Sequence, residues 1–271
     1  MLFRSEMGGK SAAIVLDDAP LDYAVDGALW GVFFHAGQVC SAGTRLFVQR
    51  SIADEFVAEL VKRAEELKVG PALEPSSDVG PVISDTQLDT VERYVSLGKD
   101  EGADVLVGGE RAVVEGHDGG YYYRPTIFGN VDNDMRIAQE EIFGPVLAVM
   151  QVEDDDEAVA LANRSIYGLA GGVWSGDTGR AVKVAERLRT GTVWINDWHM
   201  INPKYPFGGY KQSGIGHEHG VHGFNEYREI KHIHVDLGGP SRKRHPWWAL
   251  TLPRSERPAP GPDTEGPNPG G

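Results

Sequence analysis

The chain contains one cysteine, and the residues around it suit an attacking group. Cys40 lies in the segment His35-Ala36-Gly37-Gln38-Val39-Cys40-Ser41-Ala42-Gly43-Thr44-Arg45. Glycines on both sides of a thiol leave room for a substrate carbonyl to approach, which a nucleophilic cysteine requires. A lone cysteine is also ordinary core material, so this segment alone leaves both interpretations open.

Three other segments carry groups that could work with a thiol. Glu6 is followed by Gly8-Gly9, a pair that lets the backbone pass close to a ligand. A carboxylate and an aromatic ring lie in Glu140-Glu141-Ile142-Phe143-Gly144-Pro145-Val146, and a glycine loop is formed by Pro206-Phe207-Gly208-Gly209-Tyr210-Lys211-Gln212-Ser213-Gly214. Taken singly, they also fit a surface carboxylate, a helix-to-strand corner and a plain loop.

Histidines near the end of the chain raise the question of a metal site. They are His217, His219, His222, His232 and His234. Two histidines at i and i+2 share one face only in a strand, and no cysteine or helical His-x₃-His pair supports them. We therefore expect surface histidines and no metal.

Composition excludes several classes of partner. The 271 residues carry a formal net charge of −14, which disfavours nucleic acid and anionic membranes. One cysteine allows no intrachain disulfide, residues 1–5 lack the apolar core of a signal peptide, and no run reaches membrane-spanning length. We expect a cytoplasmic protein with neither nucleic-acid nor membrane partners.

Short apolar runs and amphipathic stretches alternate along the chain. Strands are predicted over residues 13–16, 45–49, 104–107, 121–128, 146–152, 169–174 and 191–196. Helices are predicted over residues 21–34, 51–68, 84–99, 154–163 and 178–188, with Asp18 as the cap of the first. The alternation predicts an α/β fold with helices on both faces of a parallel sheet, with the strand containing Pro125 away from its centre. The first helix would deliver the chain to Cys40.

After Asn196 the chain changes character. Residues 203–220 are predicted to form a glycine-rich loop, and the segment from Asn225 to Leu237 alternates polar and apolar residues with the period of a strand. Such a strand could add to the sheet of another subunit, so we expect a homo-oligomer, a dimer or a tetramer. Half of the 16 prolines follow residue 239, which predicts a largely disordered tail over residues 239–271.

Together and in this order, the four chemistry-bearing segments closely resemble the aldehyde dehydrogenase superfamily. The resemblance covers Glu6 to about Leu237. It implies a Rossmann-related, parallel-sheet catalytic domain at residues 10–220, preceded at residues 1–9 by a remnant of a coenzyme-binding domain. Residues 221–238 would be an oligomerisation strand, followed by the Pro-rich tail.

The resemblance also implies a reaction. The Cys40 thiolate would attack an aldehyde, hydride would pass from the resulting thiohemiacetal to NAD or NADP, and Glu6 would activate water to hydrolyse the thioester. Glu141 would bind the nicotinamide ribose, with Phe143 beside the nicotinamide ring and Gly8 close to the cofactor. The aldehyde pocket would include Val39, Ser41, Trp198, His199, Ile201 and Phe207.

Members of this superfamily are nearly twice as long, and this chain resembles their C-terminal half. Their upstream dinucleotide-binding domain and oxyanion-binding asparagine have no counterpart here, so we expect a truncated or partial sequence. Residues 214–220 have the wrong spacing for a dinucleotide-binding turn. Three interpretations stay open: part of an NAD(P)-dependent aldehyde dehydrogenase, a silent fragment or pseudoenzyme that only oligomerises, and a residual cysteine esterase that needs no hydride acceptor.

Overall fold

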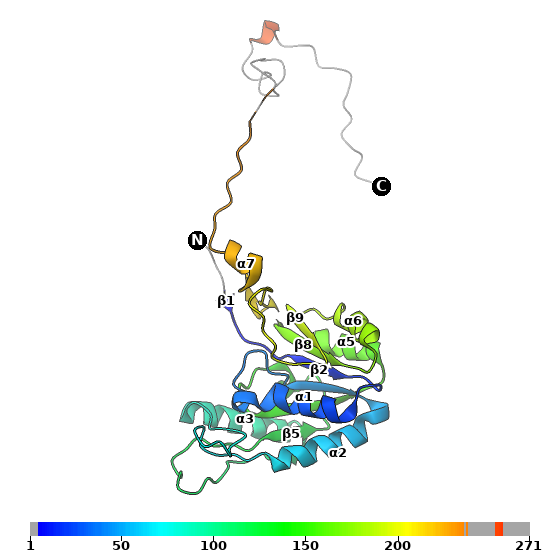
Figure 1. Ribbon diagram of the computed structural model, residues 1–271, viewed down its shortest axis with the longest axis vertical. Coiled ribbons are helices and arrows are strands. Elements are labelled where there is room, and N and C mark those ends of the chain that lie inside the picture. Colours follow the sequence, from blue (N-terminus) through cyan, green and yellow to red (C-terminus); the bar gives the residue numbers. More distant parts are fainter. Residues whose placement is uncertain (1–4, 236, 238–252, 257–271) are drawn as a thin grey trace. The chain divides into compact units, whose positions relative to one another are not determined.

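The computed structural model describes residues 5–235, 237 and 253–256 (Figure 1). The chain divides into two compact units, Met1–Glu229 and Ile230–Gly271. The first unit contains the main sheet, and the second contains a 3₁₀ turn, η3 (Arg254–Glu256). Among the helices of the described residues, none has the length and apolar character needed to cross a membrane.

The first unit is built on a seven-stranded sheet in which only one edge strand is antiparallel. In spatial order the strands are β4 (Asp104–Val107), β5 (Thr126–Gly129), β6 (Val146–Val152), β3 (Arg45–Gln49), β2 (Ala12–Val15), β8 (Ala170–Trp174) and β9 (Thr192–Ile195). The central strands are apolar runs buried on both faces, as parallel strands covered by helices require. β4 alternates between exposed and half-buried residues, which suits its edge position.

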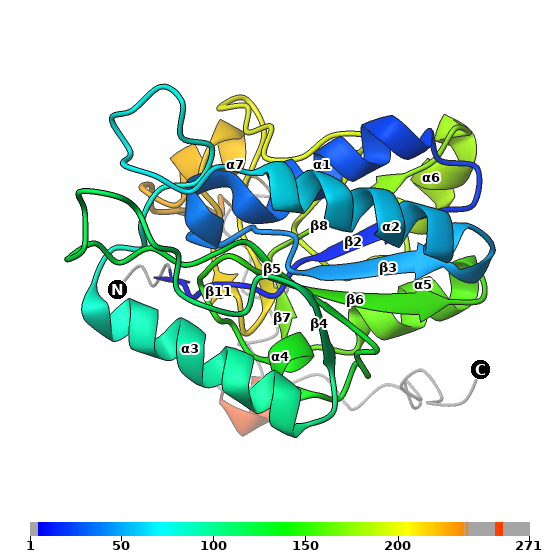
Figure 2. The ribbon, with the colours of Figure 1, turned by 90° about the horizontal axis from the view of Figure 1, so that it is seen from below.

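Helices cover both faces of the sheet (Figure 2), and the sheet separates two hydrophobic core clusters. The helices α1 (Leu21–Phe33), α2 (Arg50–Glu66) and α3 (Asp85–Asp100) share one core cluster with Ala13 and Val15. The helices α5 (Asp155–Asn163) and α6 (Thr178–Ala185) share the other with Ile14 and Leu16. Successive residues of a strand point to opposite faces, so one buried strand supplies both clusters. The predicted α/β fold with a mostly parallel sheet is confirmed.

Most predicted elements are present with shifted ends, and shorter ones were missed. The strand predicted over residues 121–128 is confined to Thr126–Gly129 and lies second from the edge, with Pro125 just before it. The missed elements are α4 (Arg136–Gln139), α7 (Gly220–Asn225), the pair β1 (Ser5–Glu6) and β11 (Gly214–Ile215), and the pair β7 (Tyr167–Gly168) and β10 (Tyr210–Lys211). β10 and β11 lie inside the segment predicted to be loop.

The prediction that Asp18 caps the first helix is wrong. The cap position is held by Pro20, without a side-chain hydrogen bond. The Asp18 carboxylate instead accepts hydrogen bonds from the Ser175 hydroxyl at 2.8 Å and the Asp177 backbone N–H at 2.9 Å. It also pairs with Arg180. Asp18 therefore ties the end of β2 to the segment after β8.

The segment after α7 contains no strand within the described residues 226–235 and 237. Its apolar side chains are exposed, and that of Ile230 is 99% accessible. Because strand pairing needs a partner, an oligomerisation strand at residues 225–237 stays a prediction. The rings of His232 and His234 lie 6.3 Å apart, and the described residues include no group of three or more side chains that could hold a metal. Most of the predicted tail, residues 239–271, lies outside the described residues.

Candidate active site at the amino edge of the sheet

The chemistry-bearing segments meet where the parallel strands begin. Gly9 precedes β2, Cys40 precedes β3 and Gly144 precedes β6, and these strands are neighbours or next neighbours in one parallel sheet. Parallel strands place their amino ends at one edge. Segments that are more than a hundred residues apart in sequence are therefore adjacent there.

A tight backbone reversal presents Cys40. After α1 the chain forms the 3₁₀ turn η1 (Phe34–Gly37), in which His35, Ala36 and Gly37 have φ values of 52°, 56° and 71°. Such left-handed geometry costs a non-glycine residue about 1–2 kcal/mol, so tertiary packing must hold the turn. A Cβ atom on Gly37 would overlap the carbonyl group of Gly144. The turn before the partly exposed Cys40 is thus packed against the Glu140–Val146 bend.

The Gly8-Gly9 pair lies between the Cys40 segment and Glu141. The Gly9 N–H donates to Glu141 Oε1 at 3.0 Å. Gly8 has φ of 95°, and a Cβ atom there would overlap the same carboxylate. A Cβ atom on Gly9 would lie 2.7 Å from the Cys40 carbonyl oxygen. In the described residues these glycines make room for Glu141 and the Cys40 backbone, and a place for Gly8 beside a cofactor stays a prediction.

Glu141 and Phe143 have a geometry that fits a cofactor at this edge. Oε2 of Glu141 has no hydrogen-bond donor among the described residues, which leaves it available to a hydroxyl group. Burial raises the pKa of the Glu141 carboxyl, while the Gly9 N–H and the charge of Lys10 act in the opposite direction. Phe143 has φ of 56° and its side chain is 37% exposed. A hydrogen-bond acceptor and an aromatic ring are therefore both accessible.

The glycine loop lies against the Glu6 segment. Glu6 pairs through its backbone with Gly214, and the next residue, Met7, donates its N–H to the Ser213 carbonyl at 2.9 Å. Lys211 anchors the loop elsewhere, because its Nζ donates to the carbonyls of Asn163 at 2.8 Å and Ser165 at 3.1 Å. The position of the Glu6 carboxylate lies outside what the structure describes.

Ser41, the residue after Cys40, is held by two consecutive side chains. The indole Nε1 of Trp198 donates to the Ser41 carbonyl, and Ser41 Oγ lies within hydrogen-bond distance of His199 Nδ1, both at 3.2 Å. Burial lowers the pKa of His199 to about 4, so the ring is neutral near pH 7. The rings of Trp30 and Phe34 have centroids 6.5 and 5.5 Å from that of His199. A largely aromatic surface therefore borders the cysteine segment.

The residues predicted to line an aldehyde pocket differ in their exposure. Ile201 is 52% exposed and Val39 is half-buried. Phe207 is buried, and its backbone pairs with Glu218. Ser41 and Trp198 are almost completely buried, at 1% and 2% exposure. The assignment of these residues to an aldehyde pocket stays a prediction.

Sequence reasoning missed Lys10 and Arg45. Lys10 is 2% exposed, its Nζ has no hydrogen-bond partner among the described residues, and burial lowers its pKa to about 7. Arg45 is also 2% exposed, and it donates to the Lys10 carbonyl and to the last carbonyls of α5, including that of Ala162 at 2.8 Å. The sequence signal for Lys10 was its place just before an apolar run, and the signal for Arg45 was its place as the first residue of one.

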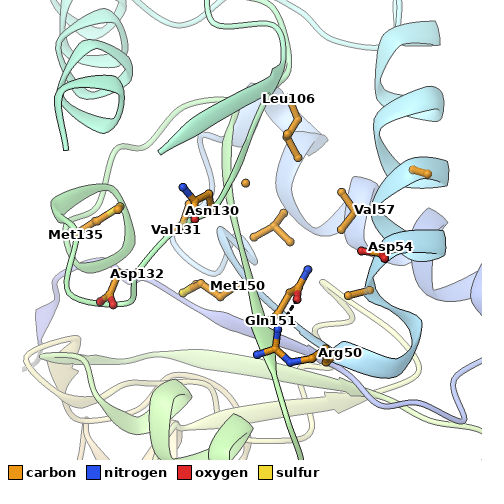
Figure 3. Close-up of a pocket in the computed structure, with 14 residues that line it drawn as sticks. Arg50, Asp54, Val57, Leu106, Asn130, Val131, Asp132, Met135, Met150 and Gln151 are labelled. Carbon is orange, nitrogen blue, oxygen red and sulfur yellow. Dashed lines mark hydrogen bonds between the residues drawn. The ribbon is translucent and has the colours of Figure 1, made fainter. Parts of the chain in front are cut away.

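A separate cavity of about 810 Å³ lies at the carboxyl edge of the sheet (Figure 3). It is bordered by α2, the end of β6 and the segment after β5, and Arg50 donates to Gln151 at its rim at 2.9 Å. Because Cys40 precedes β3 and Arg50 follows it, the cavity and the thiol lie at opposite edges. The cavity is not part of the candidate active site.

Comparison with known proteins bears on this arrangement. A model of the aldehyde dehydrogenase family matches residues 3–233. The chain belongs to the aldehyde dehydrogenase family. Among the similar members of that family, betaine aldehyde dehydrogenase of Bacillus subtilis (strain 168) is 52% identical over 229 residues, which cover 84% of this chain and 47% of that protein. Betaine aldehyde dehydrogenase of Brucella anthropi is 44% identical over 233 residues, covering 86% and 48% respectively.

Solved aldehyde dehydrogenase structures share the fold. The crystal structure of betaine aldehyde dehydrogenase from Staphylococcus aureus in complex with NAD+ has a TM-score of 0.81 and 49% identity, covering 83% of this chain and 44% of that one. An aldehyde dehydrogenase from Bacillus cereus has a TM-score of 0.81 and 46% identity, with 84% and 46% coverage. The chain thus spans about half the length of the aldehyde dehydrogenases that it matches.

Proposed function

We propose that this chain supplies the nucleophile, the hydrolytic base and the nicotinamide-proximal residues for NAD+-dependent oxidation of an aldehyde to a carboxylic acid. One observation carries the proposal: Gly9 donates its N–H to the Glu141 carboxylate and lies so close to the Cys40 carbonyl that a Cβ atom would not fit, at the edge where Glu6 enters the fold. A cysteine segment close to a carboxylate that can accept a hydrogen bond from a hydroxyl group matches the needs of a covalent oxidation.

Cys40 acts first. Its thiolate attacks the aldehyde carbon, a C–S bond forms, and the carbonyl π electrons move to oxygen, which the Cys40 backbone N–H stabilises. When the oxyanion collapses, the C–H bond breaks with its electron pair and a thioester remains on Cys40. The hydride acceptor for this step would be NAD+.

Glu6 acts second. Its carboxylate takes a proton from water as the water oxygen attacks the thioester carbon. The new tetrahedral centre collapses, the C–S bond breaks, and the Cys40 thiolate is regenerated as the carboxylic acid leaves. The net reaction converts aldehyde, water and NAD+ into acid, NADH and a proton. Glu141 Oε2 would accept a hydrogen bond from the nicotinamide ribose, and the exposed Phe143 ring would contact the nicotinamide face.

The names of the relatives make betaine aldehyde the first substrate to test. The neutral His199 ring and the nearby rings of Trp30 and Phe34 support an aldehyde that carries an apolar or quaternary ammonium group, because aromatic faces attract such cations. A direct comparison uses betaine aldehyde and 3,3-dimethylbutanal, which has the same shape without the charge. A preference for the charged substrate would support cation recognition, and equal rates would contradict it.

The decisive experiment measures NADH formation by the purified chain, and by the chain joined to the upstream half of the Bacillus subtilis relative. We expect the joined protein to form NADH, and we expect Cys40→Ala and Glu6→Gln each to abolish this turnover. Glu74→Gln makes the same change at an exposed carboxylate outside the site, so it serves as the matched control and should keep the turnover. A joined protein that folds and oxidises no aldehyde would refute the proposal.

A cysteine esterase is the second candidate, because Cys40 is partly exposed and ester hydrolysis needs no hydride acceptor. Hydrolysis of p-nitrophenyl acetate by the chain alone, lost in Cys40→Ala, would support it. We also propose self-association through residues 225–237, whose apolar side chains are exposed. Light scattering tests this, and a monomer at all concentrations would contradict it.

A further inference from the structure

Trp198 fills a space that three glycines from separate elements leave open. A Cβ atom on Gly31 in α1 would lie 3.1 Å from the indole ring, and one on Gly43 would lie 2.8 Å from it. A Cβ atom on Gly172 in β8 would overlap the ring. The indole is 2% exposed, so it has essentially one position in the fold.

The chain before Trp198 is fixed as well. Asn196 has φ of 52°, and its side-chain amide exchanges two hydrogen bonds of 2.9 Å with the backbone of Ser175 at the end of β8. This pins the segment after β9 to the sheet two residues before Trp198. The side chains of Trp198 and His199 therefore project from a rigid support.

Both side chains act on the residue next to the nucleophile. Trp198 Nε1 donates to the Ser41 carbonyl and His199 Nδ1 pairs with Ser41 Oγ, so Ser41 is held by its backbone and by its side chain. The Gly43 N–H donates to the Gly31 carbonyl at 2.9 Å, which fixes the other end of the same short segment. The peptide that carries Cys40 is thus restrained on its C-terminal side by these contacts.

We propose that Trp198 and His199 are positioning residues that orient Cys40 by holding Ser41. The inference rests on the proposed function, since orientation matters only if Cys40 attacks a carbonyl. Attack on a carbonyl requires the thiolate and the Cys40 N–H to face the same carbon–oxygen bond. Simple alkylation of the thiol has no oxyanion and does not need this alignment.

The test compares two reactions at Cys40 in the full chain, which is possible because no second cysteine competes. For each variant we would measure the acylation rate with p-nitrophenyl acetate and the alkylation rate with iodoacetamide. Trp198→Phe keeps an aromatic ring and removes the N–H donor. Loss of one hydrogen bond predicts a ratio of acylation to alkylation about fivefold below wild type.

Trp174→Phe is the matched control, because that indole is also 2% exposed but its nitrogen has no hydrogen-bond partner among the described residues. It should leave the ratio unchanged. Ser41→Ala and His199→Asn each remove one partner of the second contact, and asparagine tolerates the φ of 61° at position 199. Each should lower the ratio, and the double variant should lower it no further.

A ratio that stays at the wild-type value in Trp198→Phe, with only a lower melting temperature, would overturn the proposal. If Trp198→Phe does not fold, the same ratio is measured in Ser41→Ala and His199→Asn. Wild-type ratios in both variants would overturn the proposal. If the wild-type thiol alkylates but is not acylated, the proposed function fails for this chain. Amide exchange at Gly43 then decides: about fivefold faster exchange in Ser41→Ala supports positioning, and unchanged exchange refutes it.

Discussion

Glu140 and Glu141 are neighbours in the chain, but their carboxylates lie in opposite environments. Glu140 accepts hydrogen bonds from Arg136 at 2.7 Å and from the Tyr94 hydroxyl at 2.6 Å, and these bonds lower its pKa to about 2. Glu141 is held by the Gly9 N–H, and burial raises its pKa. One carboxylate therefore supports the fold, while the other is kept at some cost in stability.

This difference predicts opposite effects of the same substitution. Glu140→Gln should lower the free energy of unfolding by about 1 kcal/mol at pH 7, after allowance for solvent screening of an exposed group. Glu141→Gln should not lower it, because glutamine keeps an acceptor for Gly9 and removes a partly buried charge. Urea unfolding of the two variants checks this. The Glu140 contribution is present above its ordinary pKa of 4.5 and disappears as the pH falls toward 2. A larger loss for Glu141→Gln would contradict the assignment.

Gly37 should tolerate alanine much less well than Gly102 does. Both have positive φ, 71° and 95°, so both substitutions incur backbone strain of about 1 kcal/mol. Only at Gly37 would the new methyl group overlap another backbone carbonyl, that of Gly144, whereas nothing lies within 4 Å at Gly102. We expect Gly37→Ala to cost about 3 kcal/mol in total. Thermal unfolding measures the difference, and equal losses would show that the contact with Gly144 does not matter.

Lys10 should make the protein more stable as the pH rises. Its pKa is about 7 in the fold and 10.5 ordinarily, so the unfolded chain binds more protons between these values. The free energy of unfolding therefore increases from pH 7 to pH 10.5, by an amount on the order of 4 kcal/mol from this group. Lys10→Met should remove this part of the pH dependence while filling the same space. Urea midpoints at pH 7 and pH 9 provide the test, and parallel profiles for the two proteins would contradict it.

His199 should contribute a loss of stability in acid. Burial lowers its pKa from 6.5 to about 4, so the unfolded chain takes up the proton first as the pH falls. Stability is retained above pH 6.5 and falls between pH 6.5 and pH 4, by about 2 kcal/mol after allowance for partial exposure. The pH profile of unfolding should be flatter in His199→Asn. Urea unfolding of both proteins between pH 4 and pH 7 provides the test, and parallel pH profiles would contradict the assignment.

The sequence predicts well the elements whose signal is local. The strand Arg45–Gln49 was predicted with both ends correct, because an apolar run between Thr44 and a helical pattern is readable in one window. The strand predicted from residue 121 starts only at Thr126, because its extent depends on pairing with Val146 of β6. The Asp18 error has the same origin, since its hydrogen-bond partners lie beyond residue 174.

The candidate site divides in the same way. The family could be recognised from residue types and their order, while the roles that the resemblance implies for Cys40 and Glu141 stay predictions. The closeness of Gly9 to both segments could not be predicted, because it depends on strand order in the sheet. Trp198 was expected to meet a substrate, yet its ring is buried against glycines of three elements that no local pattern connects.

The thiol and the 810 Å³ cavity lie at opposite edges of the sheet, which has a practical use. β3 alone has five residues, which corresponds to about 17 Å at the usual rise per residue. The protein could therefore be immobilised on a solid support through the cavity edge while the reactive edge faces the solution. In that orientation a sensor surface would leave the Cys40 thiol open to reagents and keep the attachment chemistry away from it.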